Sequence, residues 1–393
     1  MPLSCQKHRF ALELGVHYLN GVAYSPGLLS GIAHAAAGFR LKAATPFAIA
    51  ARDHFDTADR IRWLFAELIG GNDPERVAWV PAVSYGMATV AQNLHRWPGI
   101  GAKKEIILIG EEFPNNVYAF ERVCAALGLS VKTVDKPDSP ADRGARWNER
   151  LLEAIGPETA LVVASQVHWI YGTVFDLAAL GERCRAVGAM LAVDATQSVG
   201  VMPFDVQAIQ PDAVICAAYK WLLGPYGIAV GWYGPFFDGG VPIEENWMNR
   251  EESDHFAGLT RYTRAYRPKA QRYNGGEFSQ FAQLPVLEDS LRQILEWGVA
   301  EMQAYCRELS KPAIPRWEAL GCGLDAPDQR AAHLFGLSLP AGVDTAGLVG
   351  LLTGQRVYVS LRGGALRVSL NVYNDAADVE ALTAALETLM PGR

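Results

Sequence analysis

The sequence predicts an α/β fold in which a mostly parallel sheet is covered by helices on both faces. Three observations favour this fold class: seven short β-rich runs between residues 76 and 234, the continuously apolar character of most of them, and the amphipathic stretches that separate them. Strands that are apolar at consecutive positions suit a sheet buried on both faces. Regular alternation of strands with helices favours parallel pairing.

The seven runs predict seven strands, taken here in chain order. They are RVAWVP (76–81), EIILIG (105–110), SVKTVD (130–135), ALVVASQV (160–167), AMLAVDAT (189–196), AVICAAY (213–219) and IAVGWYG (228–234). Two of the stretches between them show a helical period, with apolar residues on one face at Val117, Phe120, Cys124 and Leu127, and at Leu177, Leu180, Cys184 and Val187. Ligands of such sheets gather beyond the carboxyl ends of the strands.

A second, smaller unit is expected after the alternation ends. Residues 237–285 are rich in Gly, Pro and charge, which indicates an active-site or interface segment. One long helical pattern then covers 286–311, and the chain closes with a strand at 365–372 and a helix opened by Asp375. We therefore expect a large domain over 31–285 and a small α+β domain over 286–393.

Composition excludes several classes of function. The formal net charge is −7 and no basic block stands out, so nucleic acid is not an expected partner. No stretch is apolar enough for a transmembrane helix, and residues 1–15 do not resemble a signal peptide, so a cytoplasmic location is expected. The six cysteines are scattered without a C-x-x-C pair, which fits reduced thiols rather than a disulfide scaffold or a metal site.

The chemistry is predicted from an acidic residue and a lysine that follow two neighbouring strands. Asp194 ends one apolar run, and Lys220 comes just after the end of the next; the two residues are 26 positions apart, about one strand–helix–strand repeat. A lysine with a lowered amine pKa can form a Schiff base with an aldehyde. A carboxylate facing a pyridine nitrogen keeps that ring protonated. Taken singly, each residue has a plainer reading, Asp194 as a helix cap and Lys220 as a solvated side chain, but together they favour catalysis.

Other residues supply what such a ring needs. The turn at Ser84, Tyr85 and Gly86 follows a strand and opens a helical run, so its N–H groups can bind a phosphate. Phe113 follows the next strand and can cover a flat ring, although a core role is equally consistent with its position. Arg362 and Arg367 flank the closing strand, where an arginine fork can clamp a carboxylate or form a structural ion pair.

These segments resemble the class V aminotransferase superfamily of fold-type I pyridoxal 5'-phosphate (PLP) enzymes, which includes cysteine desulfurases, selenocysteine lyases, kynureninase and isopenicillin N epimerase. The resemblance runs nearly end to end, and the Asp and Lys segments are its most specific parts. The segments that carry it are YLNGVAYSP, AVSYGMATVAQNL, EEFPNNVYAF, SQVHWIYGTVFDL, VDATQSVG, AAYKWLLGPYGIA, RYNGGEFSQF and LRVSLNVYND.

The resemblance implies a role for each matching residue. Lys220 would carry PLP as a Schiff base and shuttle protons, Asp194 would pair with the ring nitrogen, and Gln197 would approach the phenolic oxygen. The phosphate turn and the stacking Phe113 match in position, and Arg367 falls on the arginine that binds substrate carboxylate. Members are usually homodimers with shared sites, so residues 272–279, with Gly276, would reach the partner. Residues 1–30 would pack beside the small domain.

Four departures from the family pattern bear on the reaction. The loop before Arg367 is short and has no cysteine, which argues against persulfide chemistry. Ala217 and Tyr219 replace a serine and a histidine, and Tyr219 can still donate to phosphate. His168 and Trp169 stand where many members have an asparagine near the ring. Glu277 stands near a phosphate-binding threonine, and its charge would repel phosphate, so it is expected to point elsewhere.

The sequence leaves the reaction open between two readings of similar weight. The first is an aminotransferase-like enzyme acting on a small amino acid, and the second is a PLP-dependent C–S or C–C lyase or an epimerase. A non-catalytic PLP-fold binding protein is a weaker third reading, because Lys220 and Asp194 are both present. A Rossmann dehydrogenase is excluded because no G-x-G-x-x-G opens a helix after a strand. Tyr24, His168, Trp169 and Arg362 are expected to shape the substrate pocket.

Overall fold

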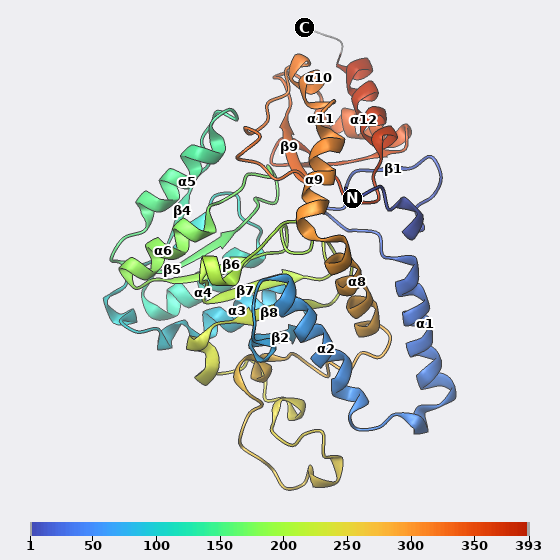
Figure 1. Cartoon of the computed structure of the whole chain (residues 1–393). Coiled ribbons are helices and arrows are strands. Elements are labelled where there is room, and N and C mark those ends of the chain that lie inside the picture. Colours follow the sequence, from blue (N-terminus) through green and yellow to red (C-terminus); the bar gives the residue numbers. More distant parts are fainter. Residues whose placement is uncertain (1, 391–393) are drawn as a thin grey trace.

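A seven-stranded sheet forms the centre of the computed structural model, which describes residues 2–390 (Figure 1). The strand order is β2-β8-β7-β6-β5-β3-β4, and only β8 runs antiparallel to its neighbours. All seven predicted strands are present: β2 (Val77–Val80), β3 (Glu105–Ile109), β4 (Ser130–Val134), β5 (Thr159–Ser165), β6 (Met190–Asp194), β7 (Ala213–Ala217) and β8 (Ala229–Tyr233). The predicted α/β class with a mostly parallel sheet is confirmed.

Helices cover both faces of the sheet, as the continuously apolar strands require. One face packs against α3 (Val83–Asn93) and α4 (Asn115–Leu127). The other packs against α2 (Asp53–Leu68), α5 (Arg143–Ala154), α6 (Leu177–Val187) and α8 (Leu284–Trp297). The short α7 (Val206–Ile209) follows β6, and α1 (Leu29–Ala44) lies along α8 at the edge of the molecule (Figure 1).

The long helix predicted over 286–311 is two helices. The helix α8 ends at Trp297, and α9 (Val299–Ser310) begins directly after Gly298. Gly298 has φ 75° and ψ 118°, a conformation that breaks the helical hydrogen-bond series. The apolar period continues across the break, which is why the pattern alone predicts one helix.

The C-terminal part forms its own sheet and core. Its antiparallel strands are β9 (Leu334–Ser338), β11 (Ser360–Arg362) and β12 (Ala365–Ser369), in the order β11-β12-β9. Its helices are α10 (Ile314–Ala319), α11 (Thr345–Gly354) and α12 (Ala376–Leu389), the last with Asp375 as N-cap in a capping box. The N-terminal segment lies against this part, because β1 (His17–Tyr18) pairs with β10 (Val357–Tyr358). No helix among residues 2–390 is long and apolar enough to cross a membrane.

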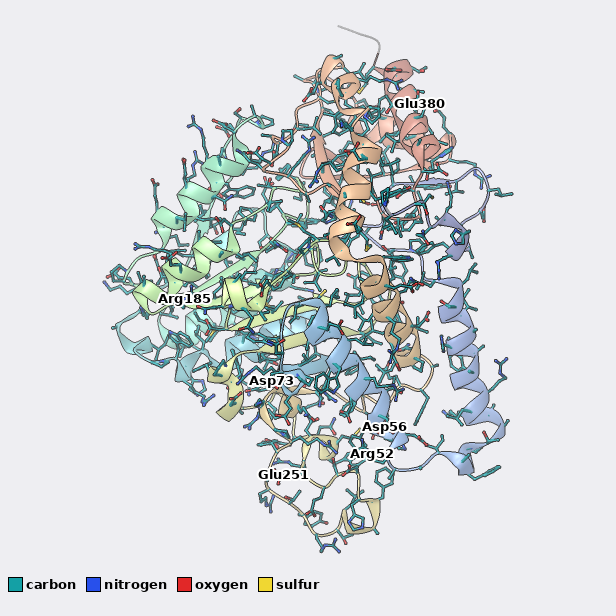
Figure 2. All side chains as sticks on the ribbon, viewed as in Figure 1. Arg52, Asp56, Asp73, Arg185, Glu251 and Glu380 are labelled. Carbon is teal, nitrogen blue, oxygen red and sulfur yellow. The ribbon has the colours of Figure 1, made fainter. Side chains whose placement is uncertain are left out.

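Residues 237–283 contain no α-helix or β-strand, and part of this segment forms the loops at the bottom of the view in Figure 1. Ion pairs tie this segment to the sheet domain: Arg52 of the α2 N-terminus contacts Asp254 at 2.9 Å, and Asp73 contacts Lys269 at 2.6 Å. Figure 2 shows Arg52 and Asp56 together where α2 meets the segment. The buried Asn274 also accepts hydrogen bonds from the Trp79 backbone and from Arg62.

Candidate active site

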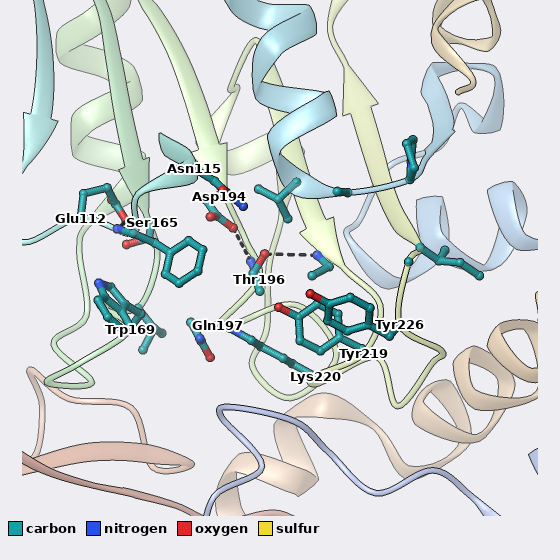
Figure 3. A pocket seen from close by; sticks show the side chains of 18 residues that line it. Glu112, Asn115, Ser165, Trp169, Asp194, Thr196, Gln197, Tyr219, Lys220 and Tyr226 are labelled. Carbon is teal, nitrogen blue, oxygen red and sulfur yellow. Dashed lines mark hydrogen bonds between the residues drawn. The ribbon is translucent and has the colours of Figure 1, made fainter. Parts of the chain in front are cut away.

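A pocket lies beyond the carboxyl ends of β5, β6 and β7, where ligands of parallel sheets bind. The register places Ser165, the last residue of β5, directly beside Asp194, the last residue of β6. The loop after β3 supplies Phe113, and the segment after β7 supplies Lys220. Side chains distant in the sequence are thus brought together by the topology of the sheet (Figure 3).

Asp194 is 8% exposed, and both of its carboxylate oxygens accept hydrogen bonds. Its Oδ2 accepts from the Asn116 side chain at 2.8 Å, and its Oδ1 accepts from the Thr196 backbone N–H at 3.0 Å. No helix begins directly after Asp194, so the plainer reading of this residue as a helix cap does not hold. The carboxylate is fixed by two donors and faces the pocket.

Lys220 is 7% exposed and lines the same pocket, so it is not the solvated side chain of the plainer reading. Its Nζ lies 5.7 Å from the ring centroids of both Phe113 and Tyr219. Burial lowers the pKa of the amine to about 8, with Arg367 lowering it further and Asp194 opposing the shift. A large fraction of the amine is therefore uncharged and nucleophilic near pH 8.

The expected phosphate turn begins slightly earlier than its sequence suggests. The helix α3 starts at Val83 after Ala82, and Pro81, Ala82 and Val83 line the pocket. The N–H groups of Tyr85 and Gly86 donate to the Ala82 carbonyl, which leaves those of Val83 and Ser84 at the helix N-terminus for an anion.

The residues expected at this turn have different surroundings. Ser84 is exposed, and Tyr85 is half-buried with its pKa raised to about 12 by burial and by Glu244. Gly86 serves the packing of α3 on the sheet, because a Cβ there would lie 2.7 Å from Ile215 Cγ2. None of Ser84, Tyr85 and Gly86 lines the pocket, in contrast to what the sequence predicted.

An aromatic wall closes one side of the pocket. The rings of Phe113 and Trp169 meet edge to face, with centroids 5.3 Å apart, and both line the pocket. His168, expected beside the substrate, is instead fully buried between Trp147 and Tyr171 and does not line the pocket. His168 and Trp169 lie in the turn after β5, closed by the Gly172 N–H donating to the His168 carbonyl, and in this turn Trp169 lines the pocket while His168 packs into the core.

Arg367 lies behind this wall, where it contacts Trp169. Its guanidinium donates to the Trp169 carbonyl from Nη1 at 3.1 Å and to Ser360 Oγ from Nε at 3.1 Å. Burial, with Arg362 nearby, lowers the pKa of Arg367 to about 10. Among the described residues, no carboxylate forms an ion pair with Arg367 and its Nη2 makes no hydrogen bond, but Arg367 is not one of the residues that line the pocket. Arg362 is exposed, and it donates to the adjacent Leu361 carbonyl.

Three tyrosines form the rim of the pocket. Tyr219 and Tyr226 line it with ring centroids 4.5 Å apart, and Tyr24 stacks on Tyr226 at 6.1 Å. Burial raises the pKa of Tyr219 to about 12, so it stays a hydrogen-bond donor at neutral pH. Tyr226 was not expected here, although its segment GPYG directly follows the lysine motif.

Several small polar residues of the site were also missed by sequence reasoning. Thr196 lines the pocket, and its Oγ1 accepts the Ala217 N–H at 3.1 Å, as the dashed lines of Figure 3 show. Ser165 lines it with an Oγ that has no partner among residues 2–390. Glu112 and Asn115 also line it, and Asn116, which does not, donates to Asp194. Short polar side chains at strand ends are common, so only the topology distinguishes them.

Gly276 does not line the pocket of its own chain. Its φ of 60° is held by hydrogen bonds of its N–H to the Glu244 carboxylate and of its carbonyl to the Asn246 amide. Glu277 is exposed. The described residues also contain no group of three or more His, Cys, Asp or Glu placed to hold a metal ion.

The pocket fits a planar pyridine ring that carries an aldehyde and a phosphate. Asp194 would hold the ring nitrogen, Phe113 would cover one ring face, and Lys220 would bind the aldehyde. Gln197 lines the pocket and accepts from Trp221 Nε1 through its side-chain oxygen at 2.9 Å, so its amide N–H groups would be free to donate to the phenolic oxygen. The N-terminus of α3 and Tyr219 would meet the phosphate. The unpaired Ser165 Oγ supplies one more polar group for such a ligand.

Comparison with known proteins agrees with this geometry. The aminotransferase class-V family model matches residues 49–382. An isopenicillin N epimerase of Amycolatopsis lactamdurans is 28% identical over 342 residues, which cover 81% of this chain and 82% of that protein. A kynureninase of Burkholderia mallei is 26% identical over 230 residues, covering 58% of this chain and 53% of that protein.

Solved structures share the fold at lower identity. A cystine C–S lyase in complex with cysteine persulfide has a TM-score of 0.83 at 21% identity and covers 96% of this chain and 99% of its own. The cysteine desulfurase CsdA of Escherichia coli has a TM-score of 0.79 at 19% identity, with 98% and 97% covered. Because the family model spans most of the chain, this protein belongs to the class V aminotransferase family of PLP-dependent enzymes.

Proposed function

We propose that this protein acts at the α-carbon of a small amino acid and functions as an aminotransferase, with Lys220 as the group that moves the α-proton. The observation that carries the proposal is the buried Lys220 amine, whose pKa of about 8 lets it accept and release a proton near neutral pH. Bound PLP supplies a protonated ring that draws electrons away from the bonds of the α-carbon. Asp194 holds the proton on that ring.

The surrounding residues would set the orientation of the substrate. Arg367 would bind the α-carboxylate through Nη2, because its Nε and Nη1 are already engaged by Ser360 and Trp169. Arg362, exposed on β11, and Tyr24 at the rim would act only at the entrance. The aromatic wall of Phe113 and Trp169 would exclude water from the reacting carbon.

A second candidate is epimerisation, which also begins with removal of the α-proton. It is favoured by the isopenicillin N epimerases among the relatives, at 28% and 27% identity. A C–S or C–C lyase is a further outcome of the same chemistry. Desulfuration through a persulfide is disfavoured, because no cysteine lines the described pocket and five of the six thiols are buried.

The test is to incubate the PLP-loaded protein with single amino acids, with and without an added 2-oxo acid, and to identify the products. Aminotransferase activity gives more than one equivalent of a new 2-oxo acid per bound PLP only when an amino acceptor is supplied, epimerisation gives the mirror-image amino acid, and a lyase releases a fragment of the side chain. Lys220→Ala abolishes each of these, and Asp194→Asn retains PLP but loses at least about a hundredfold in rate. Full activity of Lys220→Ala would refute the proposal.

We also propose a cytoplasmic homodimer with shared active sites. Free thiols at all six cysteines suit a reducing compartment. The dimer is supported by large exposed apolar side chains on α1 and α2, among them Phe39 at 67% and Trp63 at 63% exposure. The position of Gly276 outside its own pocket agrees with a role in the partner's site.

A further inference from the structure

A second carboxyl group lies beside Asp194 at the same end of the pocket. Glu112 precedes Phe113 in the loop after β3 and lines the pocket with Asp194 (Figure 3). Its Oε1 accepts the Phe113 N–H at 2.7 Å. Its Oε2 is buried and has no hydrogen-bond partner among residues 2–390. An ionised oxygen in that position would lack both water and a donor, which is costly.

Asn116, in the first turn of α4, connects the two carboxyl groups. Its amide donates to Asp194 Oδ2 at 2.8 Å and also faces the Glu112 carboxyl. Asp194 receives a second donor, the Thr196 N–H, whereas Glu112 receives only the Phe113 N–H within normal hydrogen-bond distance. The better-solvated carboxylate of an adjacent pair keeps the charge, and the other holds the proton.

The charges around Glu112 agree with this division. Asp194 from β6 faces it, and no lysine or arginine of the described chain forms an ion pair with it. The Lys220 amine lies 5.7 Å from the centroid of the Phe113 ring, and Phe113 is the residue that directly follows Glu112. Burial first, and then the charge of Asp194, raise the pKa of Glu112 to about 7.

We propose that Glu112 is a positioning residue for Asp194 that acts in its protonated form, so that Asp194 is the only ionised carboxylate at this end of the pocket. The neutral carboxyl and the Asn116 amide together fix the orientation of Asp194 without adding a second negative charge. This inference rests on the proposed function, because it assigns Asp194 to the ring nitrogen of PLP. It implies that Glu112→Gln, which is neutral and carries a donor in place of Oε2–H, preserves the site.

The first experiment measures thermal unfolding midpoints of PLP-free wild-type protein and Glu112→Gln from about pH 5 to about pH 9. A carboxyl whose folded-state pKa is raised stabilises the fold fully only below its unfolded-state pKa, and that stability is lost as pH rises to the folded-state pKa. The unfolding midpoint of the wild type should therefore decrease relative to that of Glu112→Gln between about pH 5 and about pH 7. Above about pH 8 the difference between the two midpoints should stay constant. The matched control is Glu121→Gln, which changes an exposed residue of α4. Its unfolding midpoint should differ from that of the wild type by the same amount at every pH.

The second experiment measures the dissociation constant of PLP at about pH 6 by visible absorbance. Glu112→Gln should bind within about twofold of wild type, and Glu112→Ala, which leaves Asn116 and Asp194 without support, should bind about tenfold more weakly. A constant midpoint difference across the pH range, or a Glu112→Gln that binds as weakly as Glu112→Ala, would overturn the proposal. The unfolding data need no PLP, so failure of the proposed function would not be mistaken for failure of this inference.

Discussion

Lys220 has no hydrogen-bond acceptor for its amine among the described residues, and its burial therefore controls its charge. The pKa of about 8 means that the neutral, nucleophilic fraction falls about tenfold for each pH unit below 8. We expect the rate of PLP capture by PLP-free protein, followed by visible absorbance, to rise with pH up to about 8 and then level off. The control is Lys220→Arg, whose side chain stays charged and should therefore not capture PLP at any pH in this range. A wild-type rate that kept rising to about pH 10 would show an unperturbed amine.

Residue types at strand ends predicted part of this site, and the direction of each side chain decided the rest. Asp194, Lys220, Phe113 and Gln197 line the pocket as expected. His168 does not, because the chain turns directly after β5 and the buried His168 ring packs into the core. Residue types cannot show which side chains of such a turn face the ligand, since that depends on how the turn folds against the sheet.

The break between α8 and α9 shows what a periodic pattern omits at the scale of an element. Gly298→Ala should destabilise the protein by about 1–3 kcal/mol in urea unfolding, because φ 75° and ψ 118° strain a residue with a Cβ. The nearest atom to that Cβ, Glu301 Cγ, is 3.8 Å away, so the cost lies in the backbone. Gly350→Ala, in open space on α11, is the control and should stabilise by about 0.5–1 kcal/mol. Equal effects of both changes would contradict this explanation.

The seven sheet strands were predictable because most of them are continuous apolar runs bounded by polar loops; the exception, the edge strand β4, is rich in β-branched residues. The residue at which α3 begins was harder to predict from the sequence. The motif suggests a turn at Ser84–Gly86, but Ala82 already has extended backbone and Val83 begins the helix, since Pro81 ends the strand. The anion-binding N–H groups therefore precede the residues that the motif emphasises. Element identity follows from composition, whereas element ends depend on local hydrogen bonds.

At the scale of the whole molecule, residues 272–279 connect the fold to the proposed dimer. Asn274 is buried and fixed by Arg62 and the Trp79 backbone, while Gly276 and Glu277 are exposed two and three residues later. The segment is thus anchored to the sheet domain at Asn274 and exposed on the surface at Gly276 and Glu277. In a symmetric dimer, such a surface segment can complete the pocket of the partner.

Co-expression of two inactive chains tests whether the sites are shared. Lys220→Ala removes the amine, and Gly276→Val distorts the presented segment, because a β-branched residue is strained at φ 60°. If each site combines Lys220 of one chain with residues 272–279 of the other, a mixed dimer has one site with both intact parts. Purification through two different tags isolates the mixed dimer, which should then show about one half of wild-type activity, whereas the unselected mixture should show about one quarter. If each chain uses its own segment, every site in the mixture keeps one defect and no activity returns. Complementation therefore separates a shared active site from a dimer in which the pockets are independent.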